Sequence, residues 1–600
     1  MPKSNGKKEQ QPTVADFVVE RLEQWNVRRV FGYPGDGING VIGAIHRREK
    51  SVDFVQVAHE ELASLMATAH AKFTGEVGVC LSTGGPGAIH LLNGLYDAKL
   101  DHQPVVAIVG QQSLAGAGGS MQQETNLYSI LEDVGSEYIE IVAKPEQARH
   151  VIDRAFRIAI GERAVTVVIL PHDVQQAPAV PAPPREHGMQ HSSVGVVIPR
   201  LVPATADLRR AADVLNAGKR VAILVGQGAL HATDDVIAVA EALGAGVAKA
   251  LLGKAALPDD LPFVTGSVGW LGTAASNWMM EQCDTLLMVG TTMPYTEFLP
   301  KEGQARGVQI DIAPKSLGLR YPMEVMLAGD SAETLRALLP LIQRRTDRAW
   351  RAEVERHVTD WYATTDEQAH APADPINPQL LLWELSQRLP DDVILTADSG
   401  SSAVWLARFV KLRRGMKLSL SGGLATMGCA LPYALAGKLA FPDRAVVAIV
   451  GDGAMQMSGM GALIDVAKYW KRWSDPRLVI LILNNRDLNY VTWEQRVMEG
   501  EPKFPASQDL PDLPYASYAK LLGLDGVRVE RPEDIVGAWQ AAFAAKKPFV
   551  IDALVNADVP TLPPKLEPKL QKKLAKALDS GDPDAEGVRR QLVEQGIEGA

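Results

Sequence analysis

Two short polar motifs, each directly after an apolar run, constrain the fold of this chain more than any other feature. The first is Gly451-Asp452-Gly453, which follows the run at residues 444–450, and the second is Asn484-Asn485, which follows residues 478–483. A helical spacing of apolar residues separates the two motifs. Both runs are typical of buried strands. The sequence therefore predicts an α/β sheet whose ligand-binding rim carries an aspartate and an asparagine.

Oxygen ligands at such a rim suit a hard divalent cation. Asp452, Asn485 and a nearby main-chain carbonyl offer only oxygen, which favours Mg²⁺ over zinc, and Mg²⁺ commonly carries phosphates. The glycines on either side of Asp452 let a diphosphate approach the main chain, close to a helix N-terminus that favours anions. Taken alone, the motif also fits an ordinary strand-to-helix turn followed by a pair of asparagines.

Length, net charge and cysteine content indicate the number of domains and argue against several classes of protein. Six hundred residues exceed what one core uses, so three or four domains are expected. The net charge of −10 argues against a nucleic-acid-binding protein, which would carry a basic surface. Three scattered cysteines indicate neither a disulfide framework nor a zinc site, which fits a cytoplasmic location. The first residues lack the apolar core of a secretion signal, and no run is long enough to span a membrane.

The order of patterns predicts three consecutive α/β domains. Helix and strand patterns alternate over residues 13–176, 204–345 and 375–560, which implies doubly wound parallel sheets. The other segments are an N-terminus expected to be disordered, a Pro-rich extended linker, a charged helical connection and a basic amphipathic tail: residues 1–12, 177–203, 346–374 and 561–600.

The motifs resemble the diphosphate-anchoring motif of thiamine diphosphate (ThDP) enzymes, and the domain order is similar to the pyruvate oxidase and acetohydroxyacid synthase type. The resemblance covers roughly residues 13–560. It implies that Asp452, Asn485 and the carbonyl of Asp487 hold Mg²⁺. Thirty residues separate Gly453 from Asn484, a few more than the family usually shows, and we expect the surplus in a polar loop at residues 469–477. The implied ThDP-binding residues are Met427, Gly451, Asp452, Gly453, Ala454 and Asn485.

The resemblance also identifies an activating acid. ThDP needs a carboxylate against its aminopyrimidine ring, because the resulting imino tautomer removes the proton from the thiazolium carbon. The family takes this glutamate from a His-Glu pair after a strand, which here is His59-Glu60. Taken alone, a glutamate that opens a helix is explained by the helix dipole. In the family the glutamate serves a cofactor anchored on the neighbouring subunit, which implies a homodimer or homotetramer. Met427 matches the side chain that supports the bent cofactor, although a methionine before a helix is otherwise ordinary core.

Several residues favour pyruvate oxidases and quinone-linked pyruvate dehydrogenases over the synthases. His90 lies where pyruvate oxidases carry an active-site histidine, and Glu494 aligns with an active-site glutamate. Gln123 matches an active-site glutamine, but Gln122 replaces the usual phenylalanine before it, which bears on substrate fit. Without the resemblance, His90 is more simply a core histidine and Glu494 a solvated helix charge.

The middle domain carries segments that resemble a flavin site. Gly226-Gln227-Gly228 follows a strand but lacks the third glycine of a dinucleotide fingerprint, so it is a weak signal alone. Residues 265–269 are expected to form a small-residue turn against the flavin, and strand-end aspartates to accept ribose hydroxyls. A flavin-free middle domain is the alternative. The implied FAD-binding residues are Gly226, Gly228, Thr265, Gly266, Ser267, Val268, Gly290, Thr291, Thr292, Met293, Pro294, Asp311 and Asp330.

These resemblances imply an oxidoreductase that decarboxylates pyruvate or a close 2-oxo acid. Electrons would pass from the ThDP enamine to FAD and then to a quinone or O₂, giving acetate or acetyl phosphate. Glu60 would activate ThDP, and His90, Gln123 and Glu494 would move protons. The alternatives are an acetolactate synthase-like carboligase and a non-catalytic ThDP-fold binding protein, against which Glu60 counts.

The C-terminal tail predicts a basic amphipathic helix. Leu570, Leu574 and Leu578 form one stripe, with lysines around it. Such a helix can lie on an anionic membrane surface, which would place the protein at the inner membrane in weak peripheral contact. The stripe has no aromatic residues, and the alternatives are a helix docked on its own subunit or a mobile terminus.

Overall fold

The computed structural model describes residues 11–597 and divides them into two compact units. One unit contains the residues up to 198 together with 421–442 and 458–472. The other contains residues 199–420 and 443–457 and the residues from 473 onward. Residues 1–10, most of the N-terminus predicted to be disordered, lie outside the described part of the chain.

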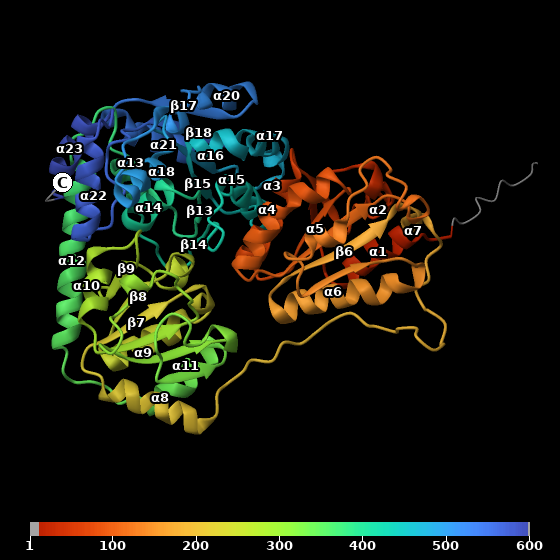
Figure 1. Cartoon of the computed structure of the whole chain (residues 1–600), viewed down its shortest axis with the longest axis horizontal. Helices are drawn as coiled ribbons and strands as arrows, with labels where there is room; N and C mark the ends of the chain where they lie inside the picture. Colours follow the sequence, from red (N-terminus) through yellow and green to blue (C-terminus); the bar gives the residue numbers. More distant parts are fainter. Residues whose placement is uncertain (1–10, 598–600) are drawn as a thin grey trace, which may run out of the picture. The chain divides into compact units, whose positions relative to one another are not determined.

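The first unit is built on a six-stranded parallel sheet in the order β2-β1-β3-β4-β6-β5. Figure 1 shows helix α6 beside strand β6 of this sheet. One apolar core packs helices α1, α2 and α6 against this sheet. The strands are β1 (Arg29–Gly32), β2 (Asp53–Gln56), β3 (Gly78–Ser82), β4 (Val105–Gln111), β5 (Tyr138–Ile141) and β6 (Val165–Pro171). The helices are α1 (Val14–Gln24), α2 (Asn39–Arg47), α3 (Glu60–Thr74), α4 (Pro86–Leu100), α5 (Leu127–Leu131), α6 (Ala148–Glu162), α7 (His172–Gln176), α15 (Ala430–Ala440) and α17 (Met460–Tyr469).

A second parallel sheet, in the second unit, has the order β12-β11-β10-β7-β8-β9. Strands β8 and β9 follow β7 on one side of the sheet, and strands β10, β11 and β12 follow on the other side of β7. The strands are β7 (Val221–Val225), β8 (Gly246–Lys249), β9 (Val264–Ser267), β10 (Thr285–Val289), β11 (Arg306–Asp311) and β12 (Val325–Ala328). The helices are α8 (Thr205–Ala217), α9 (Thr233–Leu243), α10 (Ala274–Gln282), α11 (Ser331–Leu338) and α12 (Ala349–His370).

The third parallel sheet, also in the second unit, has the order β14-β13-β15-β16-β18-β17. Numbered within itself, this is the same order as the first sheet. The strands are β13 (Ile394–Ala397), β14 (Lys417–Ser419), β15 (Val446–Gly451), β16 (Leu478–Asn484), β17 (Asp525–Val529) and β18 (Phe549–Leu554). The helices are α13 (Pro378–Arg388), α14 (Ser401–Phe409), α16 (Asp452–Ala454), α18 (Asn489–Glu494), α19 (Pro505–Gln508), α20 (Tyr515–Leu521) and α21 (Ile535–Ala544). Three parallel α/β sheets in succession confirm the predicted fold class.

Some elements differ from the sequence prediction. Strand β5 was not predicted, because it is a short edge strand whose residues are largely half-buried and lack an apolar run. The charged helical connection predicted at residues 346–374 is a single helix, α12, that lies within those bounds. Residues 265–267 lie in β9 and do not form the predicted turn. The loop after α17, where the surplus residues are expected, begins with a short 3₁₀ turn at Trp470–Arg472.

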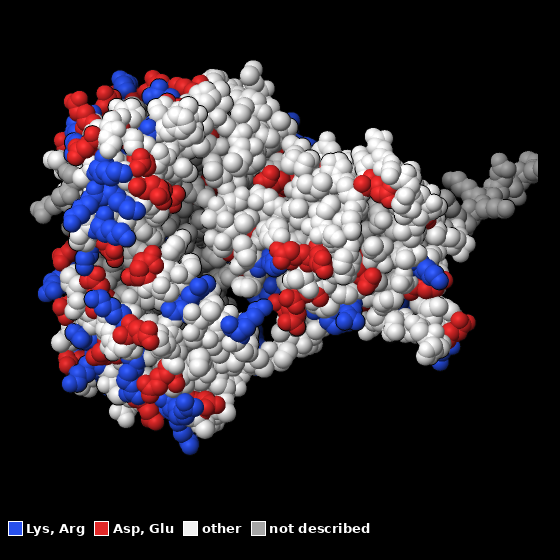
Figure 2. Space-filling model, viewed as in Figure 1, with Lys and Arg blue, Asp and Glu red and all other residues white. Residues whose placement is uncertain are grey.

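The C-terminal tail forms two helices, α22 (Pro568–Asp579) and α23 (Ala585–Glu594). Leu574 and Leu578 are buried in a cluster with Trp493 and Val497, so part of the predicted leucine stripe packs on the chain itself. Lysines gather on the opposite, exposed face of α22 (Figure 2). This packing favours the docked-helix alternative, and membrane contact stays a prediction. Among the described helices, none combines the length and apolar character needed to cross a membrane.

A buried ion pair fastens the tail to the third domain. Arg496 donates from Nε to Asp582 Oδ2 at 2.8 Å and from Nη2 to Oδ1 at 2.9 Å. Both side chains are almost fully buried, and Asp582 also accepts the Lys503 N–H at 2.8 Å. Bidentate pairs of this kind are the strongest ionic hydrogen bonds in proteins.

A second contact, in the first unit, fixes the chain between β2 and α3. Asp465 of α17 accepts the main-chain N–H of Ala58 at 3.0 Å. Tyr469, one turn later, donates its hydroxyl to the carbonyl of Gln56 at 2.8 Å. Burial raises the pKa of the Asp465 carboxyl to about 7, although the Ala58 N–H acts in the opposite direction.

Asp582→Ala is expected to lower the free energy of unfolding by about 3–5 kcal/mol, because it leaves the Arg496 charge buried without its main partner. The shift in urea midpoint and the rate of proteolysis within the tail would measure this. Lys576→Ala is the control, because its pair with Glu501 is exposed and should contribute less than about 1 kcal/mol. Equal midpoints for the two variants would contradict the role assigned to the buried pair.

Asp465→Asn is expected to change the pH dependence of stability. The native pKa lies above the ordinary value of 3.8, so the unfolded chain loses its proton first as the pH rises. Wild type therefore loses stability from about pH 4 to pH 7, and the asparagine variant, which keeps an acceptor for Ala58, does not. Melting temperatures at pH 5 and pH 8 test this. Relative to wild type, the melting temperature of the variant should be higher at pH 8 than at pH 5. An equal difference in melting temperature between variant and wild type at the two pH values would argue against a raised pKa.

Candidate active site

Glu60 is the first residue of α3, directly after the chain leaves β2. His59 caps this helix, and its Nδ1 accepts the N–H of Glu61 at 3.3 Å. The Glu60 side chain is buried, with 8% of the residue exposed. An acidic side chain at this position interacts favourably with the helix dipole.

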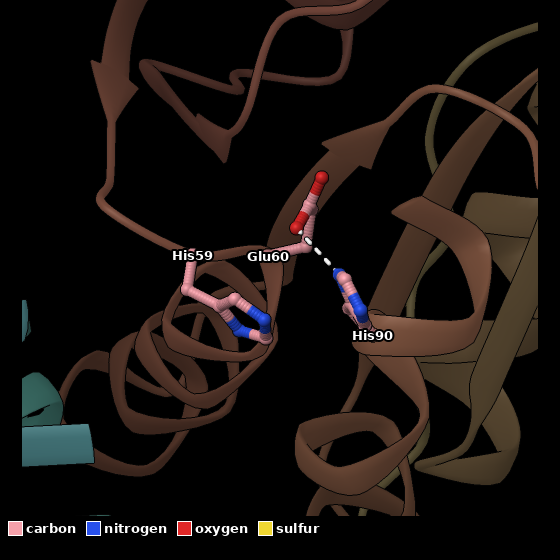
Figure 3. A group of neighbouring side chains, drawn as sticks. All are labelled: His59, Glu60 and His90. Atoms are coloured by element: carbon pink, nitrogen blue, oxygen red, sulfur yellow. Dashed lines mark hydrogen bonds and ion pairs between the residues drawn. The ribbon is translucent and has the colours of Figure 1, made fainter. Parts of the chain in front are cut away.

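His90 contacts Glu60 from the neighbouring helix. Its Nδ1 lies 3.0 Å from Glu60 Oε2, and the ring of His59 lies beside it with centroids 4.4 Å apart (Figure 3). Helices α3 and α4 approach closely at Gly94, where a Cβ would lie 2.5 Å from the main-chain nitrogen of Leu65. Glycine at this crossing therefore allows α4 to bring His90 onto the glutamate.

Gln123 lies against the N-terminal end of α4. Gly85 has φ +57°, and a Cβ there would lie 2.9 Å from the Cβ of Gln123, so the contact requires glycine. Gln123 itself has φ +65°, and its Oε1 is buried without a hydrogen-bond partner among the described residues. In the described structure no hydrogen bond joins Gln123 to Glu60 or His90, so the predicted three residues are not all in direct contact.

Helix α4 also anchors the loop that carries Met427. Asn93 donates from Nδ2 to Thr426 Oγ1 at 2.9 Å and to Glu61 Oε1 at 2.7 Å. Asp101, at the end of α4, accepts the N–H groups of Gly422 and Gly423 at 2.9 and 2.6 Å. Met427 is half-buried in this loop. These anchoring residues were not predicted, because nothing local in the sequence marks partners more than 300 positions apart.

In the second unit, Asp452 and Asn485 follow adjacent parallel strands. β15 and β16 pair with Gly451 opposite Leu483, so both motifs begin at the same sheet edge, as predicted. Asp452 Oδ2 accepts the Arg486 N–H at 2.5 Å, and Oδ1 accepts the Gly453 N–H at 2.9 Å. A Cβ on Gly451 would meet no atom within 4 Å, so the main chain there faces open space.

Among the described residues, no lysine or arginine side chain pairs with the Asp452 carboxylate. It is 2% exposed, and burial raises its pKa to about 7, with Asp487 adding to the rise. Among the charges that act on it, no lysine or arginine side chain of the described residues compensates. A buried carboxylate of this kind is costly without a cation. Its oxygen, with the amide oxygen of Asn485, forms a donor set that fits Mg²⁺.

Two further predicted residues lie close in sequence to this edge. The carboxylate of Asp487 is already engaged by Thr492 at 3.0 Å and by Lys503 at 3.2 Å, which leaves the metal role to its carbonyl, as the family pattern has it. Glu494 ends α18 and is half-buried, and burial raises the pKa of its carboxyl. Lys503 was not predicted and holds Asp487 in place.

The predicted flavin residues lie at the carboxyl ends of strands in the middle sheet. Gly226 follows β7, Gly290 follows β10, Asp311 ends β11, and Asp330 comes soon after β12. Ser267 ends β9, and its Oγ is buried without a partner among the described residues. These positions share one edge of the sheet, although residues 265–267 reach it as strand residues and not as a turn.

Several of these residues also have structural partners. A Cβ on Gly226 would lie 2.6 Å from the Cβ of Thr291, and one on Gly228 would lie 2.7 Å from the Cα of Gly290. The glycines thus allow the loops after β7 and β10 to touch. Asp330 caps α11 and lies 3.0 Å from His231. Their roles toward FAD stay predictions.

Family models match all three parts of the chain. The N-terminal TPP binding domain of thiamine pyrophosphate enzymes matches residues 12–130, the central domain matches 208–338, and the C-terminal TPP binding domain matches 398–553. Together these matches cover most of the chain and include Glu60, the middle sheet and the Asp452 edge.

Full-length relatives support the same assignment. A putative thiamine pyrophosphate-containing protein of Bacillus subtilis is 34% identical over 553 residues, 91% of this chain and 92% of the relative. A pyruvate oxidase of Lactiplantibacillus plantarum is 28% identical over 90% of this chain and 88% of its own. An acetolactate synthase large subunit of Corynebacterium glutamicum is 30% identical over 92% of this chain and 88% of its own length. The chain is a ThDP-dependent enzyme and belongs to the thiamine pyrophosphate enzyme family.

Proposed function

We propose that this enzyme catalyses the oxidative decarboxylation of pyruvate or a close 2-oxo acid, with ThDP, Mg²⁺ and FAD as cofactors. The observation that carries the proposal is the Glu60–His90 pair, 3.0 Å apart at the start of α3. A buried carboxylate at that point is what activation of ThDP requires. The pair also counts against a non-catalytic ThDP-fold binding protein.

Glu60 would hold and return a proton at the aminopyrimidine ring. His90 Nδ1 lies within hydrogen-bonding distance of that carboxylate, so it can relay the proton to solvent through its exposed ring. When bound, ThDP supplies the electron sink for decarboxylation and FAD accepts the two electrons. Gln123 would orient the substrate by donating from its amide NH₂ group to an oxygen of the 2-oxo acid. Glu494 would share a proton, because its raised pKa keeps it protonated closer to neutral pH.

Mg²⁺ would be held by Asp452, Asn485 and the carbonyl of Asp487. The unpaired negative charge of Asp452, buried at the end of β15, supports this assignment. The ion would carry the diphosphate of ThDP, and the open space at Gly451 leaves room for phosphate oxygens near the main chain.

The strand order of the middle sheet supports a dinucleotide. Counted from β7, the order is 3-2-1-4-5-6, which is the order of dinucleotide-binding sheets. Such sheets bind their ligand where the winding reverses, here between β7 and β10, and Gly226, Gly228 and Gly290 lie at that point. The unpaired Oγ of Ser267 adds a polar group at the same edge.

A carboligase is the second candidate, because acetolactate synthases match the chain over as much of its length as the pyruvate oxidase does. Formation of acetolactate from pyruvate alone would favour it. We further propose a homodimer or homotetramer, with a quinone or O₂ as electron acceptor.

The anaerobic visible spectrum of the purified protein tests the oxidation step directly. After ThDP, Mg²⁺ and pyruvate are added, the oxidised flavin band should bleach, because the two electrons released by decarboxylation have no other acceptor. A flavin band that persists while acetolactate forms would favour the carboligase. Protein supplemented with FAD that shows no flavin band would contradict the reading of the middle domain.

Glu60→Gln is expected to lower kcat by about 10²-fold or more, because an amide cannot exchange the proton that activates ThDP. The variant should still bind ThDP and Mg²⁺, as measured by quenching of tryptophan fluorescence. Glu76→Gln, an exposed change just beyond the other end of α3, is the control and should keep wild-type turnover. Unchanged turnover in Glu60→Gln would remove the catalytic assignment.

Asp452→Asn is expected to weaken Mg²⁺-dependent ThDP binding at least about 10-fold, because it removes the one charged ligand at this edge. Titration with Mg²⁺ at fixed ThDP, followed by fluorescence, measures the change. Asp525→Asn alters an exposed pair with Lys547 in the same sheet and should have no effect. Comparable Mg²⁺ affinity in the two variants would show that the ion binds elsewhere.

A further inference from the structure

We propose that His59, Glu60 and His90 form an inhibitory Zn²⁺ site in the ThDP-free enzyme. One ligand atom from each residue lies within 4.8 Å of the other two. The three side chains lie together at the start of α3, where Glu60 and His90 point toward each other (Figure 3). Both imidazoles are exposed, whereas the carboxylate between them is buried. The cluster is therefore open to an ion from solvent on the histidine side.

The chemistry of the cluster suits zinc. Two imidazoles and one carboxylate are a known zinc ligand set, and they leave a fourth position for water. With bonds of about 2.0–2.1 Å, ligand atoms in a tetrahedral site lie about 3.3 Å apart. His90 Nδ1 and Glu60 Oε2 are already 3.0 Å apart, so this pair needs almost no movement. Only His59 has to turn toward them.

The change at His59 breaks one weak contact. Its Nδ1 accepts the Glu61 N–H over 3.3 Å, which is long for a hydrogen bond. The ion also replaces the proton shared by His90 Nδ1 and Glu60 Oε2, and that proton leaves to solvent.

The predicted Mg²⁺ edge would not compete for the same ion. Asp452 and Asn485 offer only oxygen, which favours Mg²⁺, whereas the imidazoles favour zinc. Once Zn²⁺ occupies Glu60, that carboxylate cannot bind the aminopyrimidine ring. Inhibition in competition with ThDP rests on the proposed role of Glu60, but zinc binding itself does not.

The first experiment measures Zn²⁺ binding to the full-length protein after removal of ThDP and metals. Isothermal titration with ZnCl₂ should show one tight site per chain. His59→Asn removes an imidazole but keeps a good helix cap, and it should weaken this site at least about 10-fold. His46→Asn changes an exposed histidine on α2 and should leave zinc binding unchanged. Equal zinc affinity in wild type and His59→Asn would overturn the site.

The second experiment measures competition. With Mg²⁺ present, increasing Zn²⁺ should raise the apparent Kd for ThDP in wild type, and the effect should be much smaller in His59→Asn. A chelator of zinc should reverse it. If zinc binds through His59 but leaves the Kd for ThDP unchanged, the inhibitory role is overturned and the proposed contact of Glu60 with ThDP fails with it. If zinc does not bind through His59, only the zinc site is overturned.

Discussion

The close packing of α3 on α4 is the contact on which the candidate catalytic residues depend. Gly94 allows the two helices to touch, and a side chain at that crossing would meet the main chain of α3. With the helices at this distance, His90 reaches Glu60 and Asn93 reaches both Glu61 and Thr426. One helix crossing thus positions an acid, a base and the loop that carries Met427.

Glu60 and Asp452 are both carboxylates that follow a strand, but their surroundings differ. At Glu60 a helix N-terminus stabilises a carboxylate, and a histidine hydrogen-bonds to it. At Asp452 the carboxylate accepts two main-chain N–H groups, and no cationic side chain of the described residues pairs with it, so burial raises its pKa. In the proposed function, the first arrangement would hold and return a proton, and the second would hold a metal ion. The difference lies in the neighbours, because the two residues are carboxylates in similar strand-end positions.

Features set by local pattern could be predicted from the sequence. The strands that lead to Asp452 and Asn485 are apolar runs, and parallel strands end at one edge, so the shared edge followed directly. The contacts of Ala58 with Asp465 and of Asn93 with Thr426 join residues 407 and 333 positions apart and leave no local signal. Residues 265–267 were assigned wrongly, because their small side chains are typical of a turn, whereas β9 is an edge strand with an irregular register beside β8. The tail pattern predicted a helix but not that Trp493 covers its leucines.

Strand order distinguishes the middle sheet from the two outer sheets. The outer sheets share one order, and the family matches assign a TPP binding domain to each. The middle sheet reverses its winding at β7, as dinucleotide-binding sheets do. At that reversal Gly226 and Gly228 are needed for loop packing whether or not a flavin is bound, since any side chain there would meet Thr291 or Gly290. These glycines therefore cannot distinguish a flavin enzyme from a flavin-free relative. A bound flavin would instead offer a hydrogen-bond partner to Ser267 Oγ, which is buried without one among the described residues.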